Sequence, residues 1–162
     1  MMHYTRKALL WLAGLYWLGA AAQVASPAKV PQAIYFNAGG NSPLFSIQYD
    51  RRFTKQYAGA GFAAGAGYYG GFKSATWSVP ITVYYLLGRQ KHFAELSGGT
   101  VWVSERKDFW DDYQKGGGFV WHLGAGYRFQ AGKGLIGRTG VAALRAGKYQ
   151  YWSAYAGLGF AF

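Results

Sequence analysis

Three polar residues have the side-chain types of a catalytic triad for acyl transfer. His122 would act as the general base, Ser97 as the nucleophile and Glu95 as the group that orients the histidine. Such a triad must be joined by hydrogen bonds and open towards its substrate. His122 stands between Trp121 and Leu123, so in a β-strand its side chain points away from the face that these apolar residues form. We therefore expect His122 to be a hydrogen-bonding residue of an interior, with catalysis as the alternative.

Five ionisable residues occupy similar positions, within segments in which apolar and polar residues alternate. In a closed structure they would share one interior, where charges of opposite sign must pair. One interpretation is a path for protons or ions. We favour a structural network of ion pairs, because the interior of a narrow barrel is filled by side chains. The five residues are Asp50, Arg52, Glu95, Arg128 and Arg138.

The segment from Val103 to Gly118 concentrates four of the six acidic residues of the chain among aromatic residues. The acids lack the spacing of an EF-hand, and Arg106 and Lys107 dilute their charge, so we predict neither a metal site nor a cofactor. We expect an external loop, which either contacts a partner or forms a solvated hairpin whose aromatic residues cover a rim. Its predicted contact residues are Glu105, Asp108, Phe109, Trp110, Asp111, Asp112 and Tyr113.

Eight segments of alternating apolar and polar residues are the elements that would position all these side chains. Clusters of Gly, Asn, Ser, Lys or Asp separate them, as is typical of short strands joined by turns. Pro80 interrupts the fourth segment, and we expect a bulge or the start of regular pairing there. The segments are 33–38, 44–53, 57–68, 77–87, 93–102, 119–129, 135–144 and 151–162.

Alternation alone does not decide which face of the strands lies inside. All nine lysines fall outside the eight segments, and the polar face holds mainly Gly, Ala and Ser with a few charges of both signs. Such a face suits the narrow interior of an eight-stranded barrel. The other face would form an apolar patch far larger than water-soluble monomers tolerate. We therefore predict a transmembrane barrel rather than a soluble one.

The loop lengths predict the orientation of this barrel. The connections after the second, fourth and sixth segments are short, as periplasmic turns are, so both termini are expected on the periplasmic side. Aromatic residues would form a girdle at each interface. The candidates are Phe53, Tyr57, Phe93, Phe129 and Phe162 for the periplasmic girdle and Tyr68, Trp77, Trp102, Phe119 and Trp152 for the external one.

The N-terminal residues 1–22 predict a secretory signal peptide. A basic pair precedes the apolar run 8–18, and Ala20 and Ala22 form an A-x-A cleavage site. The run is shorter than the roughly 20 apolar residues that a membrane-spanning helix needs. We expect cleavage after this segment and a barrel domain over 23–162. The chain contains no cysteine, which rules out disulfides and thiol chemistry.

The chain is strongly basic, with 17 Lys and Arg against 6 Asp and Glu and a net charge of +11. A basic protein could bind nucleic acid. Export makes that partner unexpected and favours the anionic headgroups of membrane lipids instead. Basic residues mark both ends of the predicted barrel, namely Arg51, Lys55, Arg89, Lys91 and Lys133 at the periplasmic rim and Lys73, Arg145 and Lys148 at the external rim.

Four segments resemble those of the small outer-membrane β-barrel proteins of the Bacteroidota. They are YFNAGGNSPLFSIQYDRRF, VPITVYYLLGRQKHFAELSGG, LGAGYRFQAGKG and YAGLGFAF, and the resemblance extends over nearly all of the chain after residue 22. It implies an eight-stranded barrel in the outer membrane. It implies no established activity.

The C-terminal segment is similar to the assembly signal of such barrels, with hydrophobic residues at alternate positions before a terminal aromatic: Leu158, Phe160 and Phe162. This likeness implies that the barrel-assembly machinery reads the segment during biogenesis. The known eight-stranded lipid A deacylases carry a serine two positions after the histidine, where this chain has Gly124.

These patterns predict an all-β protein: an eight-stranded antiparallel up-and-down barrel of the outer membrane, preceded by a cleavable signal peptide. The expected role is non-catalytic, either structural or in surface interaction through the external loops. Outer-membrane lipids are its expected partners, and the protein is expected to be a monomer. A lipid-modifying enzyme of the lipid A deacylase type and a narrow channel are the alternatives.

Overall fold

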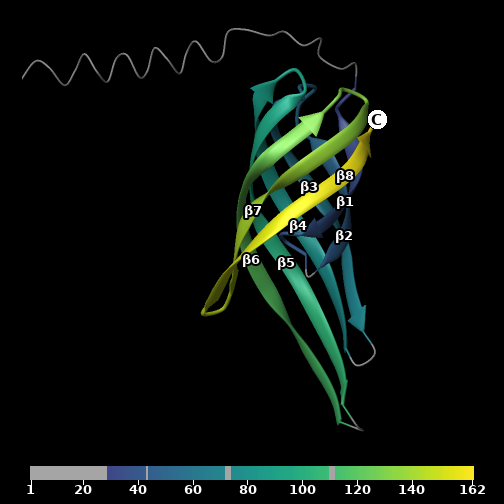
Figure 1. The fold of residues 1–162 in the computed structure, drawn as a ribbon, viewed down its shortest axis with the longest axis vertical. Helices are drawn as coiled ribbons and strands as arrows, with labels where there is room; N and C mark the ends of the chain where they lie inside the picture. The colour runs from purple at the N-terminus through teal and green to yellow at the C-terminus, as the bar shows by residue number, and fades with distance from the viewer. Residues whose placement is uncertain (1–28, 43, 72–73, 110–111) are drawn as a thin grey trace, which may run out of the picture.

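The computed structural model describes residues 29–42, 44–71, 74–109 and 112–162. Its eight strands follow one another in chain order around a closed barrel, each antiparallel to the next, and β8 pairs back to β1 (Figure 1). The predicted eight-stranded antiparallel barrel is therefore confirmed. No helix in these ranges is long and apolar enough to cross a membrane. The strands are β1 (Gln32–Gly39), β2 (Phe45–Arg52), β3 (Gly59–Gly71), β4 (Ser74–Arg89), β5 (His92–Phe109), β6 (Asp112–Gln130), β7 (Gly134–Ala146) and β8 (Tyr149–Ala161).

The two ends of the barrel differ in their connections. The end that holds the C-terminus and the β2–β3, β4–β5 and β6–β7 connections is called the turn end. The opposite end, where β1–β2, β3–β4, β5–β6 and β7–β8 are joined, is called the hairpin end. The predicted signal peptide, residues 1–22, lies outside the described residues.

Side chains alternate between the two faces of each strand, as the two-residue period of a strand requires. In β2, Phe45 and Ile47 point outward and are exposed, whereas Gln48 and Asp50 are buried inside. This arrangement is the reverse of that in a water-soluble domain. The outward apolar side chains form a band that we call the apolar belt: Ile34, Phe36, Ile47, Ile81, Val83, Trp121, Leu123, Leu158 and Phe160.

Glycine on the inner face makes room for large lumen side chains. At Gly159 of β8, an added Cβ would overlap the carbonyl oxygen of Ile34 and the side chain of Tyr35 on the neighbouring β1. Tyr35 is fully buried. An eight-stranded barrel encloses little space, so a wall residue without a side chain is needed wherever a tyrosine or arginine fills the interior.

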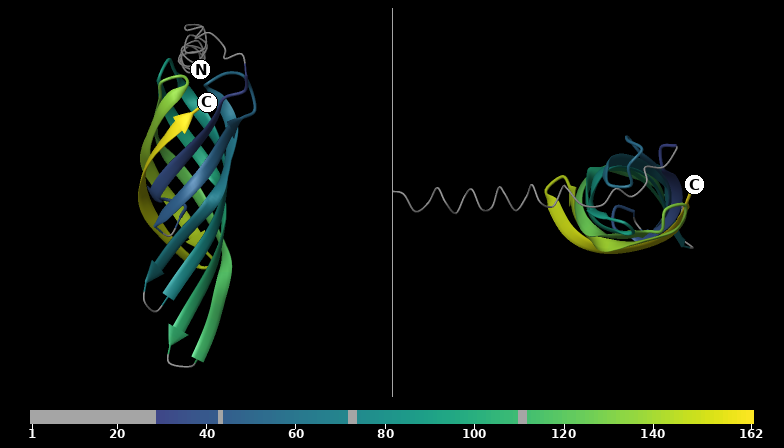
Figure 2. Two further views of the ribbon diagram at one scale, coloured as in Figure 1. Left: turned by 90° about the vertical axis from the view of Figure 1, so that its right-hand side faces the viewer. Right: turned by 90° about the horizontal axis from the view of Figure 1, so that it is seen from above.

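The hairpin end is stepped, because the strands differ in length (Figure 2). β1 pairs with β8 only as far as Gly39 opposite Tyr155, so residues 149–153 of β8 pair with β7 alone. β6 pairs with β7 from Trp121 onward, and residues 112–120 pair with β5 alone. The β5–β6 hairpin therefore extends beyond the β7–β8 hairpin.

The prediction of an external loop from Val103 to Gly118 is wrong as to its structure. β5 continues to Phe109 and β6 begins at Asp112, with Glu105 paired to Gly116 within the ladder. Polar residues can continue a two-stranded ribbon because backbone hydrogen bonds hold it together without an apolar face. The longer strands also place Lys107 and Lys115 within strands rather than outside them.

Neither alternative predicted for Pro80 is found, because there is no bulge and the regular pairing of β4 starts before the proline, at Ser74. The register between β3 and β4 is the same on both sides of the proline, with Ala64 opposite Ile81 and Gly67 opposite Ser78. The pairs between these two positions are missing from the β3–β4 ladder, while Pro80 remains paired with Val101 of β5. Proline has no N–H to donate, so it interrupts one ladder locally without adding a residue.

A buried apolar cluster closes the turn end of the lumen. Phe93 belongs to this cluster and is 2% exposed, so its predicted place in the outer aromatic girdle is wrong. It points inward because it stands two residues before Glu95 on the same face of β5. Tyr57, from the β2–β3 connection, packs against the cluster, whose buried members are Tyr35, Ala63, Tyr84, Leu86 and Phe93.

Candidate functional site

Four strands bring the five predicted lumen residues to one level of the barrel, near its turn end. Each lies on the inner face of its strand, and none is more than 8% exposed. We call this set the lumen network: Asp50 and Arg52 from β2, Glu95 from β5, Arg128 from β6 and Arg138 from β7. The structure thus places together residues that are far apart in the sequence.

Arg128 bridges both carboxylates of the lumen network. Its Nη1 lies 2.8 Å from Oδ2 of Asp50, and its Nε lies 2.8 Å from Oε2 of Glu95. Arg138 donates through Nη2 to the other oxygen of Glu95. These contacts link β2, β5, β6 and β7 across the lumen. Buried ions are stable only when they are paired in this way.

Tyrosine side chains surround the guanidinium groups, and the sequence analysis did not assign them to this site. Tyr84 donates a hydrogen bond from its hydroxyl to Oδ1 of Asp50 at 2.6 Å. The guanidinium carbon of Arg128 lies 4.7 Å from the centre of the Tyr84 ring, and that of Arg138 lies 4.6 Å from the centre of the Tyr35 ring. Cation–π contacts of this kind add to the stabilisation of desolvated cations.

Arg52 differs from the other two arginines in its contacts. Its Nη2 donates to Oε1 of Gln130 at 2.9 Å, and its guanidinium carbon lies 4.9 Å from the centre of the Tyr84 ring. No carboxylate of the described residues forms an ion pair with it, and its Nε and Nη1 have no hydrogen-bond partner there. The lumen network therefore holds three guanidinium groups and two carboxylates.

The β1–β2 turn fills the lumen on the hairpin side of the network. Asn41 donates from Nδ2 to Oγ1 of Thr82 on β4 at 2.8 Å, and the N–H of Gly40 donates to Oγ of Ser153 on β8 at 3.1 Å. Because β4 and β8 are not neighbours, the turn lies inside the barrel and contacts two separate parts of its wall. Gln48 extends the chain of polar contacts by donating to Oδ1 of Asn41 at 3.2 Å. The lumen is thus filled by hydrogen-bonded side chains.

The three residues of the possible triad do not form hydrogen bonds with one another in the described structure. His122 is 3% exposed, and its Nε2 lies 3.3 Å from Oγ1 of Thr82. Both carboxylate oxygens of Glu95 are held by arginines. Ser97 packs beside Gly124, where an added Cβ would lie 2.7 Å from the serine hydroxyl. All three face the interior, not the apolar belt.

The predicted contact residues lie at the far end of the β5–β6 hairpin. The backbone places Glu105, Asp108 and Phe109 on β5 and Asp112 and Tyr113 on β6, with Asp108 paired to Tyr113. Trp110 and Asp111 lie outside the described residues. No group of three or more His, Cys, Asp or Glu that could hold a metal ion occurs in the part of the chain that the structure describes.

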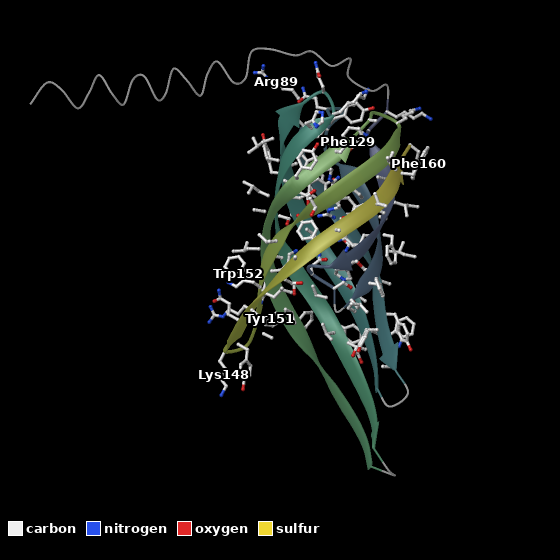
Figure 3. The ribbon with its side chains drawn as sticks, viewed as in Figure 1. Arg89, Phe129, Lys148, Tyr151, Trp152 and Phe160 are labelled. Atoms are coloured by element: carbon white, nitrogen blue, oxygen red, sulfur yellow. The ribbon has the colours of Figure 1, made fainter. Side chains whose placement is uncertain are left out.

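The residues of the predicted assembly signal all face outward. Leu158, Phe160 and Phe162 are each more than half exposed, and Figure 3 shows Phe160 projecting from β8 near the turn end. The last residue is held by β1, because the N–H of Phe162 donates to the carbonyl of Gln32 at 2.9 Å.

Exposed basic residues lie at both ends of the barrel, as Arg89 and Lys148 in Figure 3 illustrate. Between these ends the outer surface is apolar, and Trp152 projects from it near the hairpin end. Lys73 of the predicted external rim lies outside the described residues. The remaining predicted rim residues that are exposed are Arg51, Lys55, Lys91 and Lys133 at the turn end and Arg145 at the hairpin end.

Comparisons with known proteins identify the fold. No protein-family model matches the chain, and no curated protein matches it in sequence. Among solved structures, the N-terminal β-barrel domain of OprF from Pseudomonas aeruginosa is similar, with a TM-score of 0.63 and 13% identity over 82% of this chain and 96% of that one. Ail, the attachment invasion locus protein of Yersinia pestis, has a TM-score of 0.55 and 10% identity over 82% of this chain and 97% of that one.

Neisserial surface protein A is a third similar structure, with a TM-score of 0.52 and 13% identity over 82% of this chain and 94% of that one. Ail, described as an outer membrane protein, has also been crystallised in complex with the heparin analogue sucrose octasulfate. The chain thus has the fold of eight-stranded outer-membrane barrels.

Proposed function

We propose that this chain is a non-catalytic outer-membrane protein that uses its projecting β5–β6 hairpin to make contacts at the cell surface. The observation that carries this proposal is the combination of the apolar belt with a hairpin that extends past the rest of the barrel. The belt anchors the protein in lipid, and the hairpin lies in the aqueous phase beyond it.

The apolar belt supports a location in a bilayer. Leu123 and Trp121 of β6 are 72% and 64% exposed, and Ile47 of β2 is 61% exposed. Water-soluble monomers rarely expose apolar patches of more than a few hundred Å². A closed barrel leaves no unpaired strand edge within the belt. The similarity of the fold to outer-membrane barrels supports the same location.

The length of the β5–β6 hairpin supports a role outside the membrane. Residues 112–120 of β6 pair with β5 alone, and at about 3.3 Å per residue they extend roughly 30 Å along the strand direction. The segment combines aromatic and charged residues, a composition typical of recognition surfaces. Ail, a protein with this fold, is named for attachment and invasion, and we propose attachment as the role of this chain as well.

Further parts of the proposal concern biogenesis. We propose that residues 1–22 are removed as a signal peptide and that 23–162 form the barrel domain. The barrel-assembly machinery then reads Leu158, Phe160 and Phe162, and the protein works as a monomer. The outward orientation of these three residues supports this role for them.

The two alternative functions have less support. A lipid A deacylase needs its nucleophile and base in contact and open to the acyl chains, whereas His122 bonds to Thr82 inside the lumen. A narrow channel needs an open path, whereas the β1–β2 turn and the lumen network occupy the interior.

Protease treatment of intact cells tests the orientation. Trypsin should cut at Arg106, Lys107 or Lys115 in the hairpin while it spares Lys133 at the turn end, which would face the periplasm. Cleavage at Lys133 together with an uncut hairpin would reverse the orientation and refute the proposal.

Adherence of cells that display the protein tests the role. In the shortened variant, an Asn-Gly turn replaces residues 106–115 of the β5–β6 hairpin, and the control variant carries Gly116→Ser on an otherwise full-length chain. The shortened variant should fold, as shown by heat-modifiable gel mobility, but should adhere to protein-coated surfaces no better than cells without the protein. Equal adherence of the shortened and full-length proteins would exclude the hairpin as the contact surface.

A further inference from the structure

Arg52 is a buried cation without a carboxylate partner among the described residues. Its side chain is 2% exposed, and its only hydrogen bond there runs from Nη2 to Oε1 of Gln130. Two further donors, Nε and Nη1, have no partner in the described structure. A buried polar group without a hydrogen bond is costly, and an uncompensated buried charge is costlier still.

The two carboxylates of the lumen network are fully occupied by other groups. Asp50 accepts from Tyr84 at one oxygen and from Arg128 at the other. Glu95 accepts from Arg138 at one oxygen and from Arg128 at the other. Three guanidinium groups therefore face two carboxylates. Of the four other acidic residues of the sequence, Asp111 lies outside the described residues, and the backbone places the other three at the far end of the β5–β6 hairpin: Glu105, Asp108 and Asp112.

We propose that the lumen binds one small monovalent anion, chloride, beside Arg52. Arginine stays protonated in proteins, so Arg52 cannot remove the excess charge by losing a proton. A water molecule would satisfy the free N–H groups but would leave the charge uncompensated. A chloride ion beside Arg52 accepts a hydrogen bond from one of these free donors, Nε or Nη1, and its single negative charge balances the lumen network.

The surroundings of Arg52 support this site. Arg128 lies on the same Tyr84 ring, with its guanidinium carbon 4.7 Å from the ring centre, and its Nη2 also lacks a partner among the described residues. Two cations with free donors thus share one small, buried region. The missing charge is a single one, and the interior of an eight-stranded barrel is narrow. These two features favour a small monovalent anion over sulfate or an organic acid.

The basic residues of the turn end attract anions to the end of the barrel near which Arg52 lies. Gln130, the hydrogen-bond partner of Arg52, lies close to this rim. Its backbone N–H donates to the carbonyl of Lys91 at 2.8 Å. No acidic side chain lies on the described part of the turn-end rim, since all six acids are in the lumen or between 105 and 112. A rim rich in basic side chains raises the local concentration of anions. Its exposed basic residues include Arg51, Lys55, Lys91 and Lys133.

Urea unfolding of the purified protein in neutral detergent tests the proposal. Gluconate, which is too large for the lumen, is exchanged for chloride at constant ionic strength, and tryptophan fluorescence reports unfolding. When the chloride concentration reaches about ten times its dissociation constant, the unfolding equilibrium constant should have fallen roughly tenfold, and beyond that it should fall in proportion to the chloride concentration. An unfolding equilibrium that does not respond to chloride would overturn the proposal.

Two variants remove the site by opposite chemistry. Gln130→Glu places a carboxylate on Arg52 in the position of the amide oxygen, and Arg52→Met removes the cation. The chloride response should disappear in both. Arg145→Met is the control, because it removes an exposed positive charge at the hairpin end, away from the turn-end rim, and should keep the full response. If Gln130→Glu and Arg52→Met respond to chloride as the unmodified protein does, the anion binds elsewhere and the proposal fails.

A crystal grown with bromide gives a direct measurement. Bromide should produce an anomalous peak within hydrogen-bond distance of Nη1 or Nε of Arg52, and this peak should be absent from Gln130→Glu. A peak that persists in Gln130→Glu, or the lack of a peak in the unmodified protein, would contradict a chloride site at Arg52.

Discussion

The substitution Glu95→Gln tests the lumen network most directly, because Glu95 is the carboxylate that two arginines share. Its oxygens accept from Arg128 at 2.8 Å and from Arg138. Hydrogen bonds that involve charged groups contribute about 1.5–3 kcal/mol each, and breaking a buried ion pair costs about 3–5 kcal/mol. Because the amide still accepts one hydrogen bond, we expect the free energy of unfolding to fall by about 3 kcal/mol.

Urea titration of the protein in detergent, followed by tryptophan fluorescence at fixed chloride, measures this change. Glu105→Gln is the matched control, since it removes the same charge from the distant end of β5, and its effect should stay below about 0.5 kcal/mol. Heat-modifiable gel mobility shows whether each variant still closes its barrel.

The double variant Glu95→Gln with Arg138→Met separates pairing from packing. Removal of Arg138 takes away a cation that Glu95→Gln leaves uncompensated, so the double variant should be more stable than Glu95→Gln alone by about 1–2 kcal/mol. A loss of less than about 1 kcal/mol for Glu95→Gln would refute the view that the network is essential to the barrel. A double variant as unstable as the sum of both single variants would refute the pairing itself.

Three further substitutions test the wall, the belt and the ending of the barrel. Gly159→Val should prevent closure of the barrel, because a Cβ there overlaps the side chain of Tyr35. The control Gly118→Val has open space around its Cβ and should fold. Heat-modifiable gel mobility distinguishes the two variants, and normal closure of Gly159→Val would contradict the packing of Tyr35 against β8. Leu123→Arg should lower the free energy of unfolding in lipid vesicles by roughly 2–4 kcal/mol, because the side chain is 72% exposed in the apolar belt; a much smaller change would contradict a bilayer around it. Phe162→Asp should reduce the amount of assembled protein in membrane fractions, and unchanged assembly would exclude a role for the terminal aromatic.

The number and order of the strands could be predicted because each strand of a barrel wall is marked by a pattern in its own residues. Each strand alternates in hydrophobicity with a period of two residues, and turn residues separate the strands. The same alternation assigned Asp50, Arg52 and Glu95 to the inside. Side-chain direction follows from position along a strand alone, so it needs no knowledge of the neighbouring strands.

The length of the β5–β6 hairpin could not be predicted in this way. Residues 105–115 are mostly charged or polar, with aromatic residues at positions 109, 110 and 113, and they show no alternating apolar face that would mark them as strands. The described residues of this segment nevertheless pair, because the backbone N–H and C=O groups of β5 and β6 form hydrogen bonds with one another. Hydrophobic alternation marks a strand only along the apolar belt. The β5–β6 hairpin continues past the belt, so its outer part has no such pattern.

Contacts across the lumen could not be predicted from the sequence either. Tyr84 stands on the inner face of β4, as its position between Val83 and Tyr85 indicates, but its contact with Asp50 depends on the stagger of strands around the barrel. The same holds for Asn41, which reaches Thr82 only because β1 and β2 are short enough for their turn to lie inside. Register and stagger are global properties of a closed sheet.

The polar interior has a consequence for how the barrel specifies its register. A shift of β2 by one residue would turn Arg52 and Asp50 out to the apolar belt and bring Phe45 and Ile47 into the lumen. An arginine on the lipid face costs roughly 2–4 kcal/mol at the middle of a bilayer and less near its interfaces, and Arg128, left behind in the lumen, would lose the carboxylate of Asp50. Ion pairs that join β2 to β6 and β6 to β5 therefore penalise wrong registers of several strands at once. In a barrel whose apolar side chains face outward, the charged lumen supplies the specificity that an apolar core gives to a water-soluble domain.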